Sequence, residues 1–160
     1  MKHAAFAVLI AALSCADALA DVKVTFINPD KYTDANLRQR YGKTANALAL
    51  HEIESFFWRL GEAYLNPGDT LTIDVLNVDL AGRFEPWQFT YRDVRFMHDY
   101  TWPEIKLRYR LERATKPPQS GEETLADRGY LTFLQTRDYI DLMPYEKVML
   151  ERWFRQRFAR

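Results

Sequence analysis

Carboxylates are the side chains of this sequence best suited to acid–base chemistry. Asp74 and Asp79 lie in one apolar segment, an odd number of positions apart, and Asp99 follows downstream. A regular strand would place the first two on opposite faces, whereas an extra residue between them would bring them to one face. Two carboxylates on one face can act as general acid and general base, so a hydrolase that uses Asp79 with Asp74 or Asp99 is one interpretation. The alternative is that Asp79 accepts backbone hydrogen bonds from the following turn or pairs with Arg83.

Other catalytic and metal-binding patterns are missing from the sequence. It contains no HExxH pair, no GxSxG elbow, no phosphate-binding loop and no dinucleotide-binding glycine motif. His51 lies on the polar side of a helical segment, and His98-Asp99 offers only one histidine beside one carboxylate. We therefore assign no catalytic residue, metal or cofactor. The sequence favours a non-enzymatic binding or envelope-associated protein and leaves enzymatic activity open.

Basic side chains on a predicted strand are candidate contacts for an anionic ligand. In Glu104–Arg113 the apolar residues alternate with charged ones, so Arg108 and Arg110 lie on the solvent-facing side. Other basic residues extend this set: Arg92, Arg95, Lys106 and Arg113. Such a face suits a phosphorylated lipid headgroup of the envelope or an acidic envelope protein. The alternative is that the charges only keep an exposed strand soluble and protect its edge.

Trp58 departs from the pattern of its helix. It projects on the polar side, among His51, Glu54 and Glu62, so it either contacts a partner or is covered by the loop 31–43. Five residues are therefore our candidate contacts for a ligand or partner: Trp58, Asp79, Arg83, Arg108 and Arg110.

Residues 1–20 have the layout of a secretory signal peptide. Lys2 precedes an apolar run at Ala4–Leu13, which is too short to span a bilayer. Ala18-Leu19-Ala20 then supplies the small residues that a signal peptidase needs. We expect cleavage near Ala20 and a periplasmic mature chain that starts at Asp21 and has no membrane-spanning segment.

Cys15 is the one cysteine of the sequence, and it permits a second interpretation of this leader. Ala12-Leu13-Ser14-Cys15 resembles a lipobox, so a lipoprotein anchored through Cys15 is the alternative. With ordinary cleavage the mature chain has no cysteine, which excludes a disulfide, a thiol nucleophile and a sulfur-ligated metal.

Composition indicates that residues 21–160 form a single domain. The sequence has 22 Lys and Arg against 22 Asp and Glu, with 48% hydrophobic and 14% aromatic residues. A net charge near zero argues against nucleic-acid binding. The apolar content supports a compact core rather than a disordered chain.

Hydrophobic periodicity predicts two long helices and several strands. The helices are expected over 45–65 and over Pro144–Phe158, which a proline opens. The strands are expected at Val22–Phe26, Thr70–Leu80, Asp93–Met97 and Glu104–Arg113, with shorter ones at Glu123–Ala126 and Tyr130–Phe133. Residues 31–43 and Thr115–Gly121 are expected to be loops.

The strand Thr70–Leu80 contains an irregularity. Its apolar positions change phase near Val75-Leu76, which predicts a β-bulge there or a strand covered on both sides. Consecutive strands without an intervening helix favour antiparallel pairing. The expected fold is therefore α+β: a two-layer sandwich with an antiparallel sheet of four to five strands and two long helices packed on one face.

Several short segments form a pattern when taken together. They are Val24-Thr25-Phe26 with Pro29 and Tyr32-Thr33-Asp34, Val78-Asp79-Leu80-Ala81-Gly82, Trp102-Pro103, and Tyr145-Glu146-Lys147 with Met149-Leu150 and Trp153-Phe154. Together they resemble the bacterial family of unknown function numbered 3016, from Val22 to Phe158, whereas Asn36–Thr44 departs from the family pattern. That family is envelope-directed and has no assigned activity. The resemblance therefore implies an exported single domain and carries over no catalytic residue.

Overall fold

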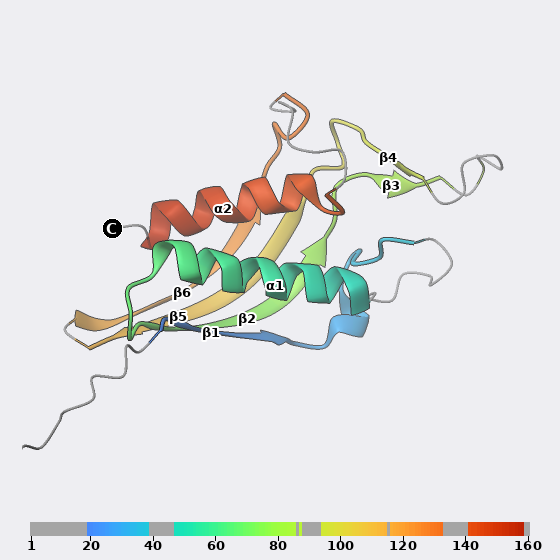
Figure 1. Ribbon diagram of the computed structural model, residues 1–160. Coiled ribbons are helices and arrows are strands. Elements are labelled where there is room, and N and C mark those ends of the chain that lie inside the picture. Colours follow the sequence, from blue (N-terminus) through green and yellow to red (C-terminus); the bar gives the residue numbers. More distant parts are fainter. Residues whose placement is uncertain are drawn as a thin grey trace, which may run out of the picture.

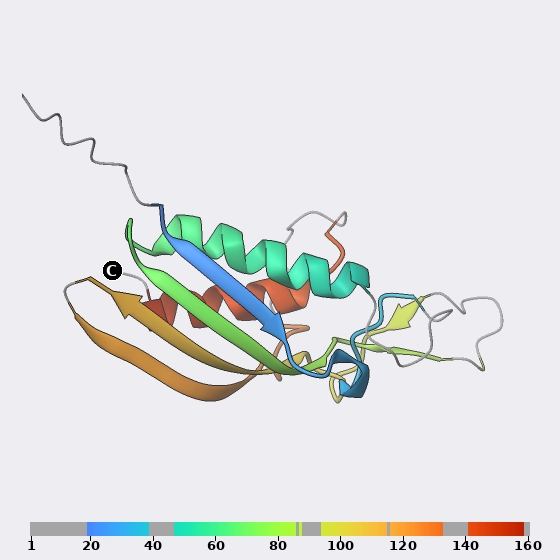
Figure 2. The same ribbon diagram turned by 90° about the horizontal axis from the view of Figure 1, so that it is seen from below.

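The computed structural model describes residues 19–38, 47–85, 87, 94–114, 116–132 and 141–158. Residues 1–18 of the expected leader, and Arg92, lie outside these residues. The main sheet has four strands, and Figures 1 and 2 show that it forms one layer while the helices α1 (Ala47–Tyr64) and α2 (Pro144–Phe158) lie side by side on one of its faces. The α+β class and the placement of both helices on one face agree with the sequence expectation.

Two amphipathic helices form the covering layer. Helix α1 spans Ala47–Tyr64 and helix α2 spans Pro144–Phe158, which is the range predicted for the second helix. The buried residues of α1 follow a helical period, and its most buried large side chain is Phe57. None of the helices among these described residues is long and apolar enough to cross a membrane.

Four strands form the sheet in the order β1-β2-β5-β6. Their bounds are Asp21–Phe26 for β1, Thr70–Asp79 for β2, Glu104–Arg113 for β5 and Lys116–Ala126 for β6. A short 3-10 helix, η1, follows β1 at Pro29–Lys31. Two further strands, β3 at Arg83–Phe84 and β4 at Arg95–Phe96, pair with each other and extend beyond one end of the sandwich (Figure 1).

The sheet is mixed rather than antiparallel throughout. Strand β1 pairs with β2 in parallel, from Asp21 opposite Thr70 to Phe26 opposite Val75, whereas β2, β5 and β6 are antiparallel. The prediction of a wholly antiparallel sheet was therefore wrong at β1. The physical reason is the crossover: α1 connects β1 to β2 across one face of the sheet, and such a connection returns the chain in the same direction.

The predicted β-bulge is present in β2. The register between β2 and β5 shifts between Val75 and Asn77, so Leu76 is the extra residue. Before the bulge, Leu71, Ile73 and Val75 are buried against the helices, and after it Val78 resumes the same face. The change of phase in the sequence thus marks a local insertion in one strand.

The edge strand β6 was missed by the sequence pattern. Thr115–Gly121 was expected to be a loop because of its prolines and glycine, but the strand begins at Lys116 and includes Pro117 and Pro118. Prolines are tolerated there because β6 is an edge strand, where backbone N–H groups on one side need no partner. The expected strand at Tyr130–Phe133 was also wrong, because residues 128–132 form turns and Phe133 lies outside the described residues.

Trp153 of α2 joins both layers of the core. Its ring meets Phe57 of α1 and Tyr109 of β5 edge-on, with ring centroids 6.3 and 5.7 Å apart. Its indole N–H donates a 3.0 Å hydrogen bond to Glu123 of β6. Edge-to-face pairs add to the stabilisation that burial provides, so this one side chain fixes both helices against the sheet.

Candidate functional site

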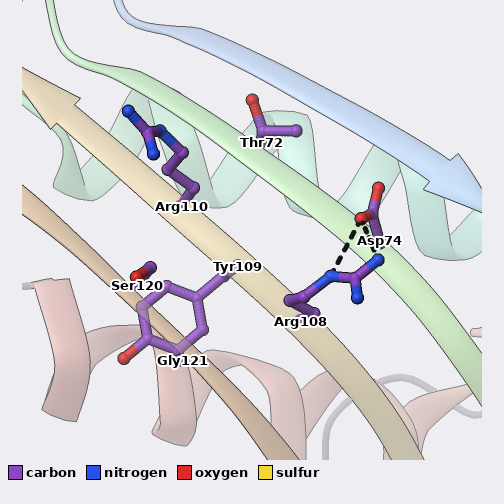
Figure 3. A pocket seen from close by; sticks show the side chains of 7 residues that line it. All are labelled: Thr72, Asp74, Arg108, Tyr109, Arg110, Ser120 and Gly121. Carbon is purple, nitrogen blue, oxygen red and sulfur yellow. Dashed lines mark hydrogen bonds and ion pairs between the residues drawn. The ribbon is translucent and has the colours of Figure 1, made fainter.

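The sheet face opposite the helices carries a shallow depression of about 380 Å³. Figure 3 shows its lining from three strands: Thr72 and Asp74 of β2, Arg108, Tyr109 and Arg110 of β5, and Ser120 and Gly121 of β6. Gly121 has no side chain, and the Tyr109 ring lies against it, within 3.0 Å of where a Cβ would stand. That ring packs on the helix side of the sheet, against Trp153 and Phe158, so the side chains that line the depression on the open face are those of Thr72, Asp74, Arg108, Arg110 and Ser120. We call this depression the open-face depression.

Two arginines of β5 flank this open-face depression. Arg108 donates to Asp74 Oδ2 from Nε and Nη2, at 3.2 and 2.9 Å, and Arg110 Nε donates to Glu112 at 2.8 Å. Both arginine side chains are more than half exposed. Exposed ion pairs of this kind contribute about 0–1 kcal/mol, so an incoming anion can compete for either guanidinium.

Arg108 and Arg110 therefore lie together where the sequence placed them, on the solvent-facing side of β5. Lys106 lies on the same face and pairs with Glu122 of β6 at 2.8 Å. Two other members of the predicted basic face lie elsewhere. Arg95 is in the short strand β4, and the Nε of Arg113 donates a hydrogen bond to Asp69, the residue that precedes β2.

The bulge does place Asp74 and Asp79 on the same face of β2, as the sequence allowed. Each carboxylate, however, binds a different arginine, since Asp74 pairs with Arg108 and Asp79 pairs with Arg83. At about 3.3 Å per strand residue they stand roughly 13–16 Å apart along β2. Two-carboxylate hydrolysis uses separations of about 5–9.5 Å, so this pair has the wrong spacing for that chemistry. Asp99 is exposed in a turn beyond β4.

A second polar group lies at the end of β2, and we call it the Asp34 cluster: Asp34, Asp79, Arg83, Arg95 and Glu146. Arg95 is its centre and is only 10% exposed. Its Nη2 donates to Asp34 Oδ2 at 2.9 Å, and its other bonds go to four backbone carbonyls, those of Asn36, Leu80, Ala81 and Gly82. A guanidinium suits this role because it presents five donors in a fixed plane.

Asp79 and Arg83 form the outer part of the Asp34 cluster. Arg83 Nη2 donates to Asp79 Oδ2 at 2.9 Å and lies 2.8 Å from Oδ1, which is an ion contact outside hydrogen-bond geometry. Burial raises the pKa of the Asp79 carboxyl, although the charge of Arg83 opposes the shift. The arrangement agrees with the second interpretation of the sequence, in which Asp79 pairs with Arg83.

Glu146 closes the inner side of the same cluster. It is 3% exposed in the first turn of α2, and its Oε1 accepts a 2.7 Å hydrogen bond from the backbone N–H of Ala81. Burial raises the pKa of this carboxyl, with the hydrogen bonds from Ala81 and from its own backbone N–H and the charge of Arg95 acting in the opposite direction.

Next to Ala81, Gly82 has a φ of 73°, and a Cβ there would meet the Phe96 carbonyl oxygen at 2.7 Å. Only glycine suits that turn.

Residues 32–34, which follow β1, form hydrogen bonds to the two residues that flank the bulge of β2. The Tyr32 hydroxyl donates a 2.7 Å hydrogen bond to the Val75 carbonyl, and Asn77 Oδ1 accepts from the Thr33 backbone N–H at 2.9 Å. Burial raises the pKa of Tyr32 to about 12. Asp34 then forms a single parallel bridge with Asp79, which brings its carboxylate to Arg95.

His98 lies outside both groups. Its Nε2 is 2.9 Å from Glu85 Oε1, its ring stacks on Tyr100, and its carbonyl accepts from the Tyr130 hydroxyl. Within the residues that the structure describes, no three His, Cys, Asp or Glu side chains come together as a metal site.

Trp58 lies on the outer side of α1, beside the edge of the sheet. Its side chain is 45% exposed, and its indole N–H donates a 3.1 Å hydrogen bond to the Val22 carbonyl of β1. The contact with β1 was not among the two alternatives taken from the sequence. A role for Trp58 in binding a partner stays a prediction.

The Asp34 cluster was not predicted as a unit. Asp34, Asp79 and Glu146 each lie in a segment that carried the family resemblance, and that shared membership was the one signal in the sequence that linked them. Arg95 lay in no such segment and was assigned to the wrong face. Its role depends on carbonyls from a turn that the sequence pattern does not reveal.

Comparison with known proteins identifies a family and no activity. No curated protein and no solved structure matches the chain. The model of DUF3016, a protein family of unknown function, matches residues 20–156, which include the whole sheet and nearly all of α2. The chain therefore belongs to the DUF3016 family.

Proposed function

We propose that this protein is exported to the periplasm and that its open-face depression binds phosphoryl groups of envelope molecules without transforming them. The observation that carries the binding proposal is the pair Arg108 and Arg110, which flank hydroxyl side chains in one depression. The proposal of export rests on the leader at residues 1–20.

The chemistry of the lining suits a phosphoryl group. Guanidinium groups form directional, charge-assisted hydrogen bonds with phosphate oxygens, and hydroxyl groups such as those of Thr72 and Ser120 can donate to the remaining oxygens. The depression is open and shallow, which suits a terminal group rather than a whole enclosed ligand. The carboxylates Asp74 and Glu112 hold the arginines in place until an anion competes for them.

The absence of a reaction is part of the proposal. Asp74 is bonded to Arg108 and stands far from Asp79, so the candidate acid and base of the hydrolase interpretation do not converge on this depression. A lining of two arginines, two hydroxyls and one paired carboxylate supports capture of an anion.

Titration of the purified protein with inorganic phosphate, followed by NMR or calorimetry, tests the binding proposal. We expect saturable binding that weakens with salt, and a loss of about ten-fold in affinity for Arg110→Ala and for Arg108→Ala. Lys106→Ala is the matched control, because Lys106 lies on the same strand and face but outside the depression. Equal losses in all three variants, or no saturable binding, would contradict the proposal.

Vesicles distinguish the sources of the phosphoryl group. Binding to vesicles that contain phosphatidylglycerol but not to pure phosphatidylcholine would indicate an anionic headgroup. Binding of free phosphate alone would indicate a soluble ligand. Capture of an acidic protein, with no response to phosphate or vesicles, would replace the proposal with a protein partner.

Fractionation of the cells, followed by determination of the protein's N-terminus in each fraction, tests export. Mass spectrometry is expected to find a chain that begins near Asp21. An acylated chain that begins at Cys15 would establish the lipoprotein alternative, and a chain that keeps residues 1–20 in the cytoplasm would contradict export.

A further inference from the structure

Strand β1 forms one outer edge of the sheet, and half of its backbone groups face away from β2. The N–H groups of Asp21 and Ile27 donate to the carbonyls of Asp69 and Val75, each at 2.9 Å. In a parallel pair, alternate residues bond to the same neighbour. The residues between them therefore turn their N–H and C=O groups outward: Val22, Val24 and Phe26.

Trp58 occupies the first of these outward groups. Its indole N–H donates to the Val22 carbonyl at 3.1 Å, from a helix that packs against β1. A backbone N–H from an added strand would need the same side of that carbonyl. The large indole ring thus stands where a neighbouring strand would begin to pair.

The opposite edge of the sheet is protected in a different way. Strand β6 contains Pro117 and Pro118, which have no N–H, and the acidic side chains of Glu122 and Glu123. Prolines and charges on an edge are common devices against pairing with another chain. Strand β1 has no proline in Asp21–Phe26, and its two charged residues, Asp21 and Lys23, lie in its first half, so the second half has neither device.

Strand β1 can pair with a second copy of the same strand along its whole length. In an antiparallel pair centred on Val24, Val22 of each chain lies opposite Phe26 of the other, and Lys23 lies opposite Thr25, so no like charges are opposed. A pair centred on Asp21 or on Lys23 would oppose like charges, and one centred on Val22 would leave residues 24–26 of a chain that begins at Asp21 without partners. Within one chain Asp21 and Lys23 already attract each other, with Lys23 Nζ 3.3 Å from Asp21 Oδ2.

We propose that Trp58 protects the β1 edge against pairing with a second copy of this chain. The indole occupies the Val22 carbonyl, which would otherwise accept a hydrogen bond from the Phe26 N–H of the second strand in the pair centred on Val24. This inference is independent of the proposed phosphoryl site, which lies on the face of β2, β5 and β6.

Trp58→Phe tests the proposal, because phenylalanine keeps an aromatic ring but has no N–H to donate. Sedimentation velocity on the protein as the cell processes it is expected to show a monomer for the wild type. For the variant we expect a concentration-dependent doubling of mass. Trp87→Phe, at a tryptophan that is 66% exposed and away from β1, is the matched control and is expected to stay monomeric.

A second substitution identifies the surface responsible. Val24→Pro removes an outward N–H of β1, so Trp58→Phe combined with Val24→Pro is expected to be monomeric again. A synthetic β1 peptide is expected to bind Trp58→Phe at least ten-fold more tightly than the wild type. A wild-type dimer formed through β1 would overturn the proposal. So would a folded Trp58→Phe protein that stays monomeric and binds the peptide no better.

Discussion

The backbone N–H of Ala81 donates a 2.7 Å hydrogen bond to Glu146 Oε1, across 65 residues of sequence. This bond joins the turn after β2 to the first turn of α2 and is buried. It also connects two segments on which the family resemblance depends, Val78–Gly82 and Tyr145–Lys147. The segments that carry the family resemblance therefore include residues that fix the sheet to a helix.

Stability at the Ala81–Glu146 contact should depend on pH. Burial raises the pKa of Glu146, so the folded state holds this proton more tightly than the unfolded chain. The contribution of protonated Glu146 to the free energy of unfolding is complete below the ordinary glutamate pKa, about 4.3. It is lost as the pH rises through the higher pKa that Glu146 has in the folded protein. Glu146→Gln keeps an acceptor oxygen and cannot ionise, so it should lack this decline.

Urea denaturation at pH 4, 6 and 8 measures the effect. The free energy of unfolding of Glu146→Gln should improve relative to the wild type as the pH rises. Parallel pH profiles for the two proteins would refute the assignment. Glu146→Ala serves as a control and should lose about 1–3 kcal/mol, because the buried Ala81 N–H then has no acceptor.

Arg95 should be the arginine of the Asp34 cluster that matters most for stability. Arg95 is nearly buried and donates hydrogen bonds to one carboxylate and four carbonyls, which the point charge of a lysine cannot replace. Arg95→Lys is expected to cost about 3 kcal/mol in chemical denaturation, as for other disrupted buried ion pairs. Arg83→Lys is the comparison, and since Arg83 is 38% exposed its loss should be below about 1 kcal/mol. Similar losses for the two variants would argue against a central role for Arg95.

Asp74 should oppose anion binding at the open-face depression. Its carboxylate holds Arg108 and adds a negative charge beside the proposed phosphoryl position. Asp74→Asn should therefore raise the affinity for inorganic phosphate by about two- to five-fold, the range expected for one exposed ion pair. Glu104→Gln removes a charge from the same face of β5 but four residues, roughly 13 Å, from Arg108, which is more than a Debye length at 0.15 M salt, and should have little effect. An unchanged phosphate affinity in Asp74→Asn would indicate that the anion binds elsewhere.

Glycine should be required at position 61 of α1, because β1 packs closely against the helix there. A Cβ at this position would lie 2.3 Å from Val22 Cγ2, which belongs to a short, branched side chain. Gly61→Ala gains about 1 kcal/mol of helix propensity, but overpacking costs about 1–3 kcal/mol, so we expect net destabilisation. In a Val22→Ala background the same substitution should become neutral or stabilising. A double-mutant cycle from thermal or urea unfolding measures this coupling, and additive effects would show that the two residues do not interfere.

Much of the secondary structure follows from local patterns. The helix Pro144–Phe158 and the strand Glu104–Arg113 were predicted with the bounds that the structure has, because their apolar residues recur with clear helical and strand periods. The bulge of β2 was predicted from a change of phase within one strand. Local composition misled at β6, because prolines are typical of loops but also occur on edge strands.

The sequence by itself determined which faces of the helices and strands are apolar, and so that two helices cover one side of a sheet. Periodicity reports burial along one segment, and this information is local. Only the tertiary structure decided that β1 runs parallel to β2, that Arg95 gathers four carbonyls, and that Asp74 and Asp79 bind different arginines. These relationships join residues far apart in the chain, and they depend on how α1 crosses the sheet and on where β3 and β4 return. No single segment contains that information.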